Sequence, residues 1–459
     1  MAVVLPKRFI PRETHVSRND SRRIKDRPGV AMTLVFKDAL FDAQWLRTAG
    51  HSSSGGADIG ECYAVAGRIA GADPESWHLA WSSLAERLQA EAEASLAAGC
   101  RASAFAGFLR ASNYFRAAYT FLIGTPVDPR VVEGYRRQRS SFGAAAALMA
   151  PKAERIAIPY GGKSLHGYFF RAAGGGPRPT LIVNGGYDST AEEAYFFSGA
   201  AAMARGYGCI TFDGPGQGAA IIEDGLVFRP DWEEVIRPVV DFALRRPEVD
   251  PNRIALMGIS FGGYLAPRAA SGEPRLAACI ADPGEFSLLE EFKSRLPGFI
   301  ARALPDGNPL ILNLLDLILR RRMKHVSAGW GLRRGLWVHG VDSPLAYIRL
   351  TRDYALEGRA ELIRCPTLVC AAENDDIGVT APKLYEVLTC PKRFIAFRAE
   401  EGAGEHCEAG ARTLFNQRAF DWLDGVFSDR QPPREGELPA RAGRNAETSR
   451  LQQATNTTT

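Results

Sequence analysis

The sequence is poor in the features that metal sites and disulfide frameworks require. Its 459 residues include 8 Cys and 7 His, and no two cysteines form a CxxC pair. The cysteines are scattered, and Cys209, Cys279 and Cys370 fall inside predicted strands, where a reduced thiol packs as a small apolar group. The sequence therefore predicts no disulfide framework, no metal site and no cofactor. We expect a reducing, cytoplasmic setting.

Long apolar runs and a strong charge of one sign are also missing. The most apolar stretch, residues 309–319, is shorter than the roughly 18 residues of a membrane span and ends in three arginines. The formal net charge is only +4, and no basic stripe is interleaved with aromatic residues. The N-terminus has no apolar segment of the secretory type. The sequence thus predicts neither a membrane segment nor a nucleic-acid partner.

One pentapeptide is typical of a catalytic serine. Residues 258–262 read Gly-Ile-Ser-Phe-Gly, between a short apolar run and residues 263–266, which can open a helix. A serine on such a strand-to-helix turn has strained backbone angles, and the flanking glycines let the chain bend that tightly. The pattern predicts Ser260 as a nucleophile. The alternative is a glycine-rich turn with a solvent-facing serine.

A base and an acid for this serine are expected later in the chain, in the order serine, acid, histidine that α/β-hydrolases follow. His406 is the only histidine after the acidic cluster at residues 373–376. Asp375 comes three residues after a predicted buried strand, where its carboxylate can reach an imidazole. We expect His406 to take the Ser260 proton and Asp375 to orient the imidazole. Alternatives for the acid are Glu373, Asp376 and Asp282.

The oxyanion that forms when Ser260 attacks a carbonyl needs hydrogen-bond donors. The backbone N–H of Phe261 is one expected donor. The other should come from the loop after the predicted strand at residues 180–183, which reads Asn-Gly-Gly-Tyr-Asp at 184–188. Its glycines let the backbone approach the substrate, so Gly186 is our first choice and Tyr187 the second. An ordinary turn at a strand end would have the same sequence.

A third turn completes the fold prediction. Residues 213–218 read Asp-Gly-Pro-Gly-Gln-Gly after the predicted strand at 209–212. This turn resembles the one before the nucleophile strand in many α/β-hydrolases, and we interpret it as structural. Three such segments in this order predict the α/β class and an α/β-hydrolase fold, with a mostly parallel, doubly wound sheet.

The rest of the chain is predicted as helical or disordered. We expect a disordered extension at residues 1–31, an N-terminal helical domain at 32–150, the hydrolase core at 151–428 and a disordered tail at 429–459. A helical insertion at about 286–359 interrupts the core and is expected to lie over Ser260 as a lid.

One helix of this domain is predicted to begin at Asp73-Pro74, because a capping residue followed by proline is a helix start signal. Trp77, Trp81, Leu84 and Leu88 then lie on one face at helical spacing. We interpret these residues as core between helices. An alternative is that residues near Arg110 and Tyr114 cover the active site.

The motifs resemble those of one branch of the α/β-hydrolase superfamily. Residues 258–270 and 401–407 resemble 2,6-dihydroxypseudooxynicotine hydrolase, the fungal polyketide-shortening hydrolases and FrsA-like proteins. Residues 73–77, 109–114 and 158–160 match features of their helical domain and core start, and the resemblance covers roughly residues 32–428. It implies C–C bond hydrolysis of acyl-aromatic or β-diketone substrates by a serine triad without metal.

Three hypotheses about the reaction remain open. The first is hydrolysis of a C–C bond next to a ketone, which an extra acid such as Asp282, Glu285 or Glu291 would assist. The second is ester, lactone or amide hydrolysis, in which His406 alone protonates the leaving group. The third is acyl transfer or cyclisation with the same triad.

The expected partner is a small aromatic or polyketide-like substrate. Possible contacts are Tyr187, Asp282 and Tyr114, and the stacking surfaces of Tyr119, Trp330 and Trp337. We also expect a homodimer, because the aromatic helical faces within residues 35–150 are wider than a lid needs to cover.

Overall fold

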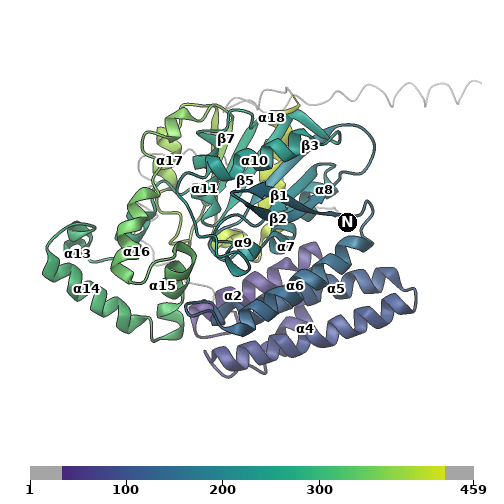
Figure 1. Ribbon diagram of the computed structural model, residues 1–459, viewed down its shortest axis with the longest axis horizontal. Helices are drawn as coiled ribbons and strands as arrows, with labels where there is room; N and C mark the ends of the chain where they lie inside the picture. The colour runs from purple at the N-terminus through teal and green to yellow at the C-terminus, as the bar shows by residue number, and fades with distance from the viewer. Residues whose placement is uncertain (1–33, 429–459) are drawn as a thin grey trace, which may run out of the picture.

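A single eight-stranded sheet forms the centre of the structure, a computed structural model that describes residues 34–428 (Figure 1). The strand order is β1-β2-β4-β3-β5-β6-β7-β8. The predicted extension at 1–31 and tail at 429–459 lie outside the described residues. The strands are β1 (Glu154–Tyr160), β2 (Lys163–Phe170), β3 (Arg178–Asn184), β4 (Gly208–Phe212), β5 (Val249–Ile259), β6 (Ala278–Asp282), β7 (Thr367–Ala372) and β8 (Lys392–Phe397).

The sheet is mostly parallel, as predicted. Strand β2 pairs antiparallel with β1 and β4, and all other neighbours are parallel. The carboxyl ends of β3, β5, β6, β7 and β8 therefore lie along one edge. The predicted catalytic segments all follow these strands, so the topology brings them to the same end of the sheet.

Helices cover both faces of the sheet because alternate strand residues point to opposite sides. One buried cluster joins Ile182, Leu256 and Val369 to helices α10, α11 and α17. The other joins Leu181, Met257 and Leu368 to α7, α8 and α18. The covering helices are α7 (Ala191–Ala194), α8 (Ala200–Ala204), α9 (Gly218–Ile222), α10 (Glu233–Leu244), α11 (Gly262–Ala270), α17 (Ala381–Val387) and α18 (Arg412–Phe427).

The N-terminal part is helical, as predicted, and packs beside the sheet (Figure 1). Helix α4 starts at Pro74, and Asp73 caps it by accepting from the Ser76 N–H at 2.8 Å. Trp77 and Trp81 are buried inside this region, so the aromatic stripe that motivated the homodimer does not form an outer face. The helices are α2 (Ala39–Gly50), α3 (Ile59–Ala66), α4 (Pro74–Ala97), α5 (Arg101–Tyr119) and α6 (Pro129–Leu148).

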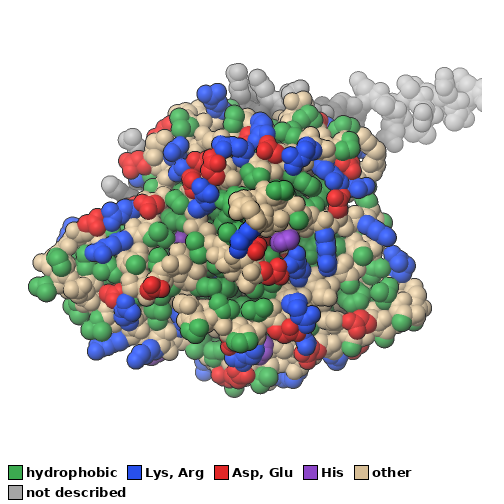
Figure 2. Space-filling model, viewed as in Figure 1, with side chains coloured by type: hydrophobic (Ala, Val, Ile, Leu, Met, Phe, Trp, Pro, Cys, Tyr) green, Lys and Arg blue, Asp and Glu red, His purple; other side chains and the backbone are tan. Residues whose placement is uncertain are grey.

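The second helical part lies between β6 and β7, where the sequence predicts an insertion. Figure 1 shows it beside the sheet, with α13 and α14 farthest from the core. On the face of the molecule in Figure 2, cationic and anionic side chains are mixed, in keeping with the small net charge of +4. The insertion contains α12 (Leu288–Ser294), α13 (Gly298–Ala303), α14 (Pro309–Arg322), α15 (Val326–His339) and α16 (Pro344–Leu350).

Candidate active site

Ser260 lies on a strained turn between β5 and α11. Its φ is +59°, a left-handed value that non-glycine residues rarely adopt. The turn is tight, because a Cβ built on Gly258 would lie 1.9 Å from the Gly262 carbonyl oxygen. The Ser260 N–H donates to the Asp282 carbonyl at 2.7 Å, which fixes the turn against the end of β6. This is the geometry of a nucleophile elbow.

The structure brings His406 and Asp375 to this serine. His406 Nε2 is 2.9 Å from Ser260 Oγ, and His406 Nδ1 is 2.7 Å from Asp375 Oδ2. The other carboxylate oxygen of Asp375 accepts the Ile377 N–H at 2.9 Å, so the side chain is held from both ends. Asn374 donates to Glu405 at 3.1 Å and ties the acid loop to the histidine loop.

The alternative acids lie elsewhere. Glu373 accepts the Ala399 N–H at 2.9 Å, and the Asp376 carbonyl accepts from Arg295 at 2.8 Å. Asp282 is buried and accepts from Arg412 at 2.9 Å, with Glu408 on the same guanidinium at 3.2 Å. Of the four acids considered from sequence, only Asp375 contacts His406 Nδ1.

The pKa values of the pair follow from their contact. Burial lowers the pKa of His406, but the Asp375 charge and hydrogen bond outweigh it and raise the pKa above its ordinary value. Burial raises the pKa of Asp375, but His406 outweighs it in turn and the net shift is downward. Each partner therefore stabilises the charged form of the other, as a base that accepts the serine proton requires.

Gly186 and Tyr187 lie beside the nucleophile. A Cβ built on Gly186 would lie 2.6 Å from Ser260 Cβ and 2.9 Å from the Phe261 nitrogen, so this approach requires glycine. Among the described residues, none accepts a hydrogen bond from the backbone N–H of Gly186, Tyr187 or Phe261. Gly186 and Phe261 therefore offer backbone donors beside Ser260 that have no intramolecular partner, and the free N–H of Tyr187 lies one residue further along the same loop.

The insertion adds a hydrogen-bonded aromatic group next to this loop. The Tyr187 hydroxyl is 2.6 Å from His339 Nε2 and 2.9 Å from the Tyr347 hydroxyl, and His339 Nδ1 is 3.1 Å from the Tyr354 hydroxyl. Burial lowers the pKa of His339 to about 3, so this imidazole is neutral. Sequence reasoning named Tyr187 but missed the other three residues, because no motif marks them.

Two buried carboxyl groups lie near Asp375. Both carboxyl oxygens of Glu285 are buried without a hydrogen-bond partner in the described chain. Burial, with the charges of Glu291 and Asp375, raises the pKa of Glu285 far above its usual range. Burial raises the pKa of Glu291 to about 7, and Glu291 accepts from the Thr380 N–H at 2.8 Å. Burial therefore favours the neutral form of Glu285, and its carboxyl group has unused hydrogen-bonding capacity. The sequence had named Glu285 only as one of three candidate acids.

Several predicted substrate contacts are not at this site. The Tyr114 hydroxyl donates to Glu61 at 2.8 Å inside the helical region, and its ring packs against Trp81. Tyr119 donates to Gln138 at 2.5 Å, and Trp330 donates to the Thr120 carbonyl at 2.8 Å. These side chains join the helical parts to each other and to the core. Asp282 faces the buried Arg412 behind the serine turn, so the predictions for Tyr114 and Asp282 as substrate contacts do not hold in this geometry.

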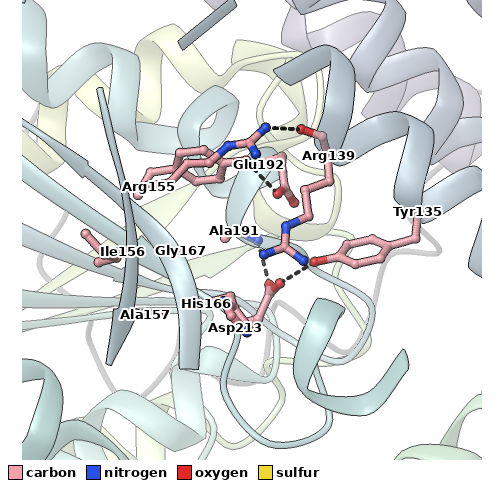
Figure 3. Close-up of a pocket in the computed structure, with 11 residues that line it drawn as sticks. Tyr135, Arg139, Arg155, Ile156, Ala157, His166, Gly167, Ala191, Glu192 and Asp213 are labelled. Carbon is pink, nitrogen blue, oxygen red and sulfur yellow. Dashed lines mark hydrogen bonds between the residues drawn. The ribbon is translucent and has the colours of Figure 1, made fainter. Parts of the chain in front are cut away.

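A separate pocket of about 150 Å³ lies where α6 meets β1 and β2 (Figure 3). Its lining contains none of the Ser260, His406 and Asp375 group. Asp213 accepts there from the Tyr135 hydroxyl at 2.8 Å and from the Ala191 N–H at 2.7 Å. These contacts support the structural interpretation of the Asp-Gly-Pro-Gly-Gln-Gly turn.

Within residues 34–428, no group of three or more His, Cys, Asp or Glu side chains has the arrangement of a metal site. No helix in the same part of the chain is both long and apolar enough to cross a membrane.

Comparison with known proteins identifies the family. Residues 180–417 match the Alpha/beta hydrolase family. The chain belongs to this family. It is 35% identical over 419 residues to 20-hydroxy-prefusarin hydrolase FUS2 of Gibberella moniliformis, covering 86% of this chain and 99% of that protein. It is 34% identical to hydrolase acrC of Aspergillus aculeatus, covering 86% and 98%.

Solved structures agree on the fold of this α/β-hydrolase. The 2,6-dihydroxy-pseudo-oxynicotine hydrolase superposes with a TM-score of 0.66 and 24% identity, covering 83% of this chain and 95% of that one. The protein AbyA5 superposes with a TM-score of 0.57 and 19% identity, covering 84% and 95%. Both superpositions include helical residues outside the sheet region. The predicted combination of a hydrolase fold with helical additions is therefore confirmed.

Proposed function

We propose that this α/β-hydrolase cleaves a C–C bond next to a ketone, with Ser260 as nucleophile, His406 as base and Asp375 as its orienting acid. The hydrogen-bonded chain from Asp375 through His406 to Ser260 carries the proposal of a serine hydrolase. The distance from Asp375 Oδ2 to His406 Nδ1 is 2.7 Å and that from His406 Nε2 to Ser260 Oγ is 2.9 Å, and both are within proton-transfer range. Ser260 itself occupies a strained turn.

The reaction begins when Ser260 Oγ attacks the ketone carbon and His406 takes the hydroxyl proton. The oxygen of the tetrahedral intermediate then accepts from the backbone N–H of Phe261 and of Gly186 or Tyr187. Collapse breaks the C–C bond, and the leaving carbon takes a proton while the acyl group stays on Ser260. Water activated by His406 releases the carboxylic acid and regenerates the serine.

The presence of Glu285 favours the proposal of C–C bond cleavage over that of ester cleavage. A carbon leaving group needs a proton donor. A buried glutamate without hydrogen-bond partners lowers the stability of the fold, so its presence here points to a role in the reaction. Glu285 has both oxygens free, and burial raises its pKa, which favours the protonated form that can donate. We assign it the transfer of a proton to the leaving carbon. The proton that His406 took from Ser260 then passes through solvent to the Glu285 carboxylate, which restores the acid and leaves His406 neutral for the attack by water.

The substrate that fits this site is an aryl ketone or β-diketone. Its leaving group can delocalise negative charge onto an enolate oxygen, which the hydroxyls of Tyr187 and Tyr347 could bind. The similarity to a protein named 20-hydroxy-prefusarin hydrolase supports a sizeable, oxygenated small molecule as substrate.

A matched substrate pair tests the proposal. An aryl β-diketone and an ester of the same aryl acid should both acylate Ser260, which mass spectrometry of the trapped protein would detect. Replacing Glu285→Gln should reduce kcat/KM for the diketone by about 100-fold and for the ester by only a few-fold. If the ester were preferred tenfold and both substrates responded equally to the replacement, an esterase would replace the C–C hydrolase. Movement of the acyl group to an internal nucleophile would indicate a cyclase.

The homodimer also remains a proposal. The aromatic helical residues pack inward and no longer support it. The remaining support is the resemblance to a branch whose members are often dimers. Light scattering on the full chain tests it, and a monomer at micromolar concentration would contradict it.

A further inference from the structure

Three arginines from outside the sheet converge on the loop at residues 185–188, which follows β3. Arg47 comes from α2, Arg116 from α5 and Arg334 from α15 of the insertion. Arg47 Nη1 donates to Asp188 Oδ2 at 2.7 Å, and Arg116 Nη2 lies 3.6 Å from the same oxygen. Asp188 directly follows the two residues that supply candidate oxyanion donors.

A second carboxylate fixes the arginines themselves. Glu193, at the start of α7, accepts from Arg47 through both oxygens, at 2.8 and 2.6 Å. Arg116 Nε is 3.2 Å from Glu193, and His51 Nε2 is also at 3.2 Å. Arg116 and Glu193 are almost fully buried, with side-chain exposures of 2% and 1%. Removing one member would leave uncompensated buried charge, so these side chains depend on one another for stability.

The loop carbonyls are held as well. Gln217 Nε2 donates to the Gly185 carbonyl at 2.6 Å and to the Gly186 carbonyl at 3.0 Å. Arg334 Nε donates to the Tyr187 carbonyl at 2.8 Å. In a trans peptide the carbonyl and the next N–H point in opposite directions. Holding these carbonyls on one side therefore directs the N–H groups of Gly186, Tyr187 and Asp188 away from Gln217 and Arg334.

The network is also unbalanced in charge. Arg47, Arg116 and Arg334 face only Asp188 and Glu193 among the charged groups that hold the loop, and Arg116 Nη1 is buried without a partner in the described chain. Burial raises the pKa of Asp188, but the three arginines lower it below its usual value. An excess positive charge in a buried setting favours negative charge on an oxyanion nearby.

We propose that Arg47, Arg116 and Arg334, acting through Asp188 and the Tyr187 carbonyl, are positioning residues that hold the oxyanion donors toward Ser260. The helical domain and the insertion thus complete the active site instead of only covering it. This inference rests on the proposed serine hydrolysis, and it assigns a role to residues that contact neither the nucleophile nor the base.

Steady-state kinetics of Asp188→Asn, Arg47→Lys and Arg334→Met test the inference on a reactive aryl ester. Each should lower kcat by about 10- to 100-fold with KM within threefold, because donor alignment matters most in the transition state. Arg334→Lys should recover part of the loss, since one donor can still reach the Tyr187 carbonyl. The double variant of Arg47→Lys and Asp188→Asn should cost less than the product of the single effects.

Two arginines serve as matched controls. Arg110→Gln removes the 3.1 Å pair with Glu61 inside the helical region. Arg333→Gln removes donors to the Met323, His325 and Val326 carbonyls at the start of α15. Neither residue contacts the loop, so kcat should stay within twofold of wild type. Thermal unfolding of every variant separates misfolding from misalignment.

The outcomes distinguish this inference from the function on which it rests. Labelling of Ser260 by a fluorophosphonate in wild type, with no ester turnover in Ser260→Ala, supports the hydrolase independently of the arginines. Wild-type kcat in Asp188→Asn or Arg334→Met would overturn the positioning role. So would a fall in kcat that the Arg110 or Arg333 control reproduces, or one that follows the unfolding temperature across all variants.

Discussion

At the scale of single residues, the proposed chemistry depends on three side chains that act as a unit. Ser260→Ala and His406→Ala should each reduce turnover by about 10⁴- to 10⁶-fold, because either change removes the nucleophilic step. Asp375→Asn should cost less, since this residue orients and supports charge. Steady-state rates measure the effect. Asp376→Asn is the matched control, because Asp376 is the next residue in the chain and its carboxylate does not contact His406. A fully active Ser260→Ala protein would reject the serine hydrolase.

The pH dependence is a second prediction at this scale. His406 must be neutral to accept the serine proton, and Asp375 holds its pKa above the ordinary value. Activity should therefore be low below the pKa of His406 and rise through one ionisation as pH increases. Asp375→Asn removes the charge that raises the pKa, so the midpoint of kcat/KM should shift to lower pH. An unchanged or higher midpoint would argue against Asp375 as the partner.

The sequence predicted the residues of the site that lie in motifs. Ser260 follows from its pentapeptide and His406 from its position, and the structure places both with Asp375. His339, Tyr347 and Tyr354 could not be predicted, since they come from the insertion, whose packing no local pattern encodes. The arginine network was equally hidden, because Arg47 and Asp188 are separated by 141 positions and meet only in the folded chain.

At the scale of elements, the turn between β5 and α11 is the tightest constraint. Gly258→Ala would place a methyl group 1.9 Å from the Gly262 oxygen, so the strand and helix would have to separate. We expect destabilisation by about 3 kcal/mol or more, or no folding. Chemical denaturation measures it. Gly425→Ala in α18 is the control. Apart from its chain neighbours and the backbone of its own helix, no described atom lies within 4 Å of that Cβ, so the change should stabilise by about 0.5–1 kcal/mol.

The strands differ in how well the sequence predicted them. The predicted strand at 180–183 lies within β3 and the one at 209–212 lies within β4, because each is a continuous apolar run. Neither β1 nor β2 was predicted as a strand, and residues 158–160 of β1 were noted only as the start of the core. Both pair antiparallel, and β1 alternates exposed and buried positions, which gives a weaker pattern than an apolar run.

At the scale of the whole molecule, the helical region and the sheet share one core. Phe108 of α5 and Phe142 of α6 belong to the same buried cluster as Tyr168, Phe170 and the α18 residues. The Phe142 ring meets the Tyr168 ring at a centroid distance of 4.8 Å and the Tyr195 ring at 5.4 Å. Together with the arginine network, this contact makes the helical region part of the folded enzyme.

A chain that starts at Lys152 should therefore fail to fold stably. Removing the preceding helices would expose the apolar residues of β2 and α7, which costs hydrophobic stability. It would also leave Asp188 and Glu193 without Arg47 and Arg116, which costs electrostatic stability. We expect the full chain to unfold in one cooperative transition and the shortened chain to aggregate or bind a hydrophobic dye. Scanning calorimetry with dye binding measures both, and a shorter deletion that removes only residues 1–33 is the control. A Lys152 chain with a cooperative transition near that of the full protein would mean that the sheet is independent, and the coupling between helical region and active site would then have to be weak.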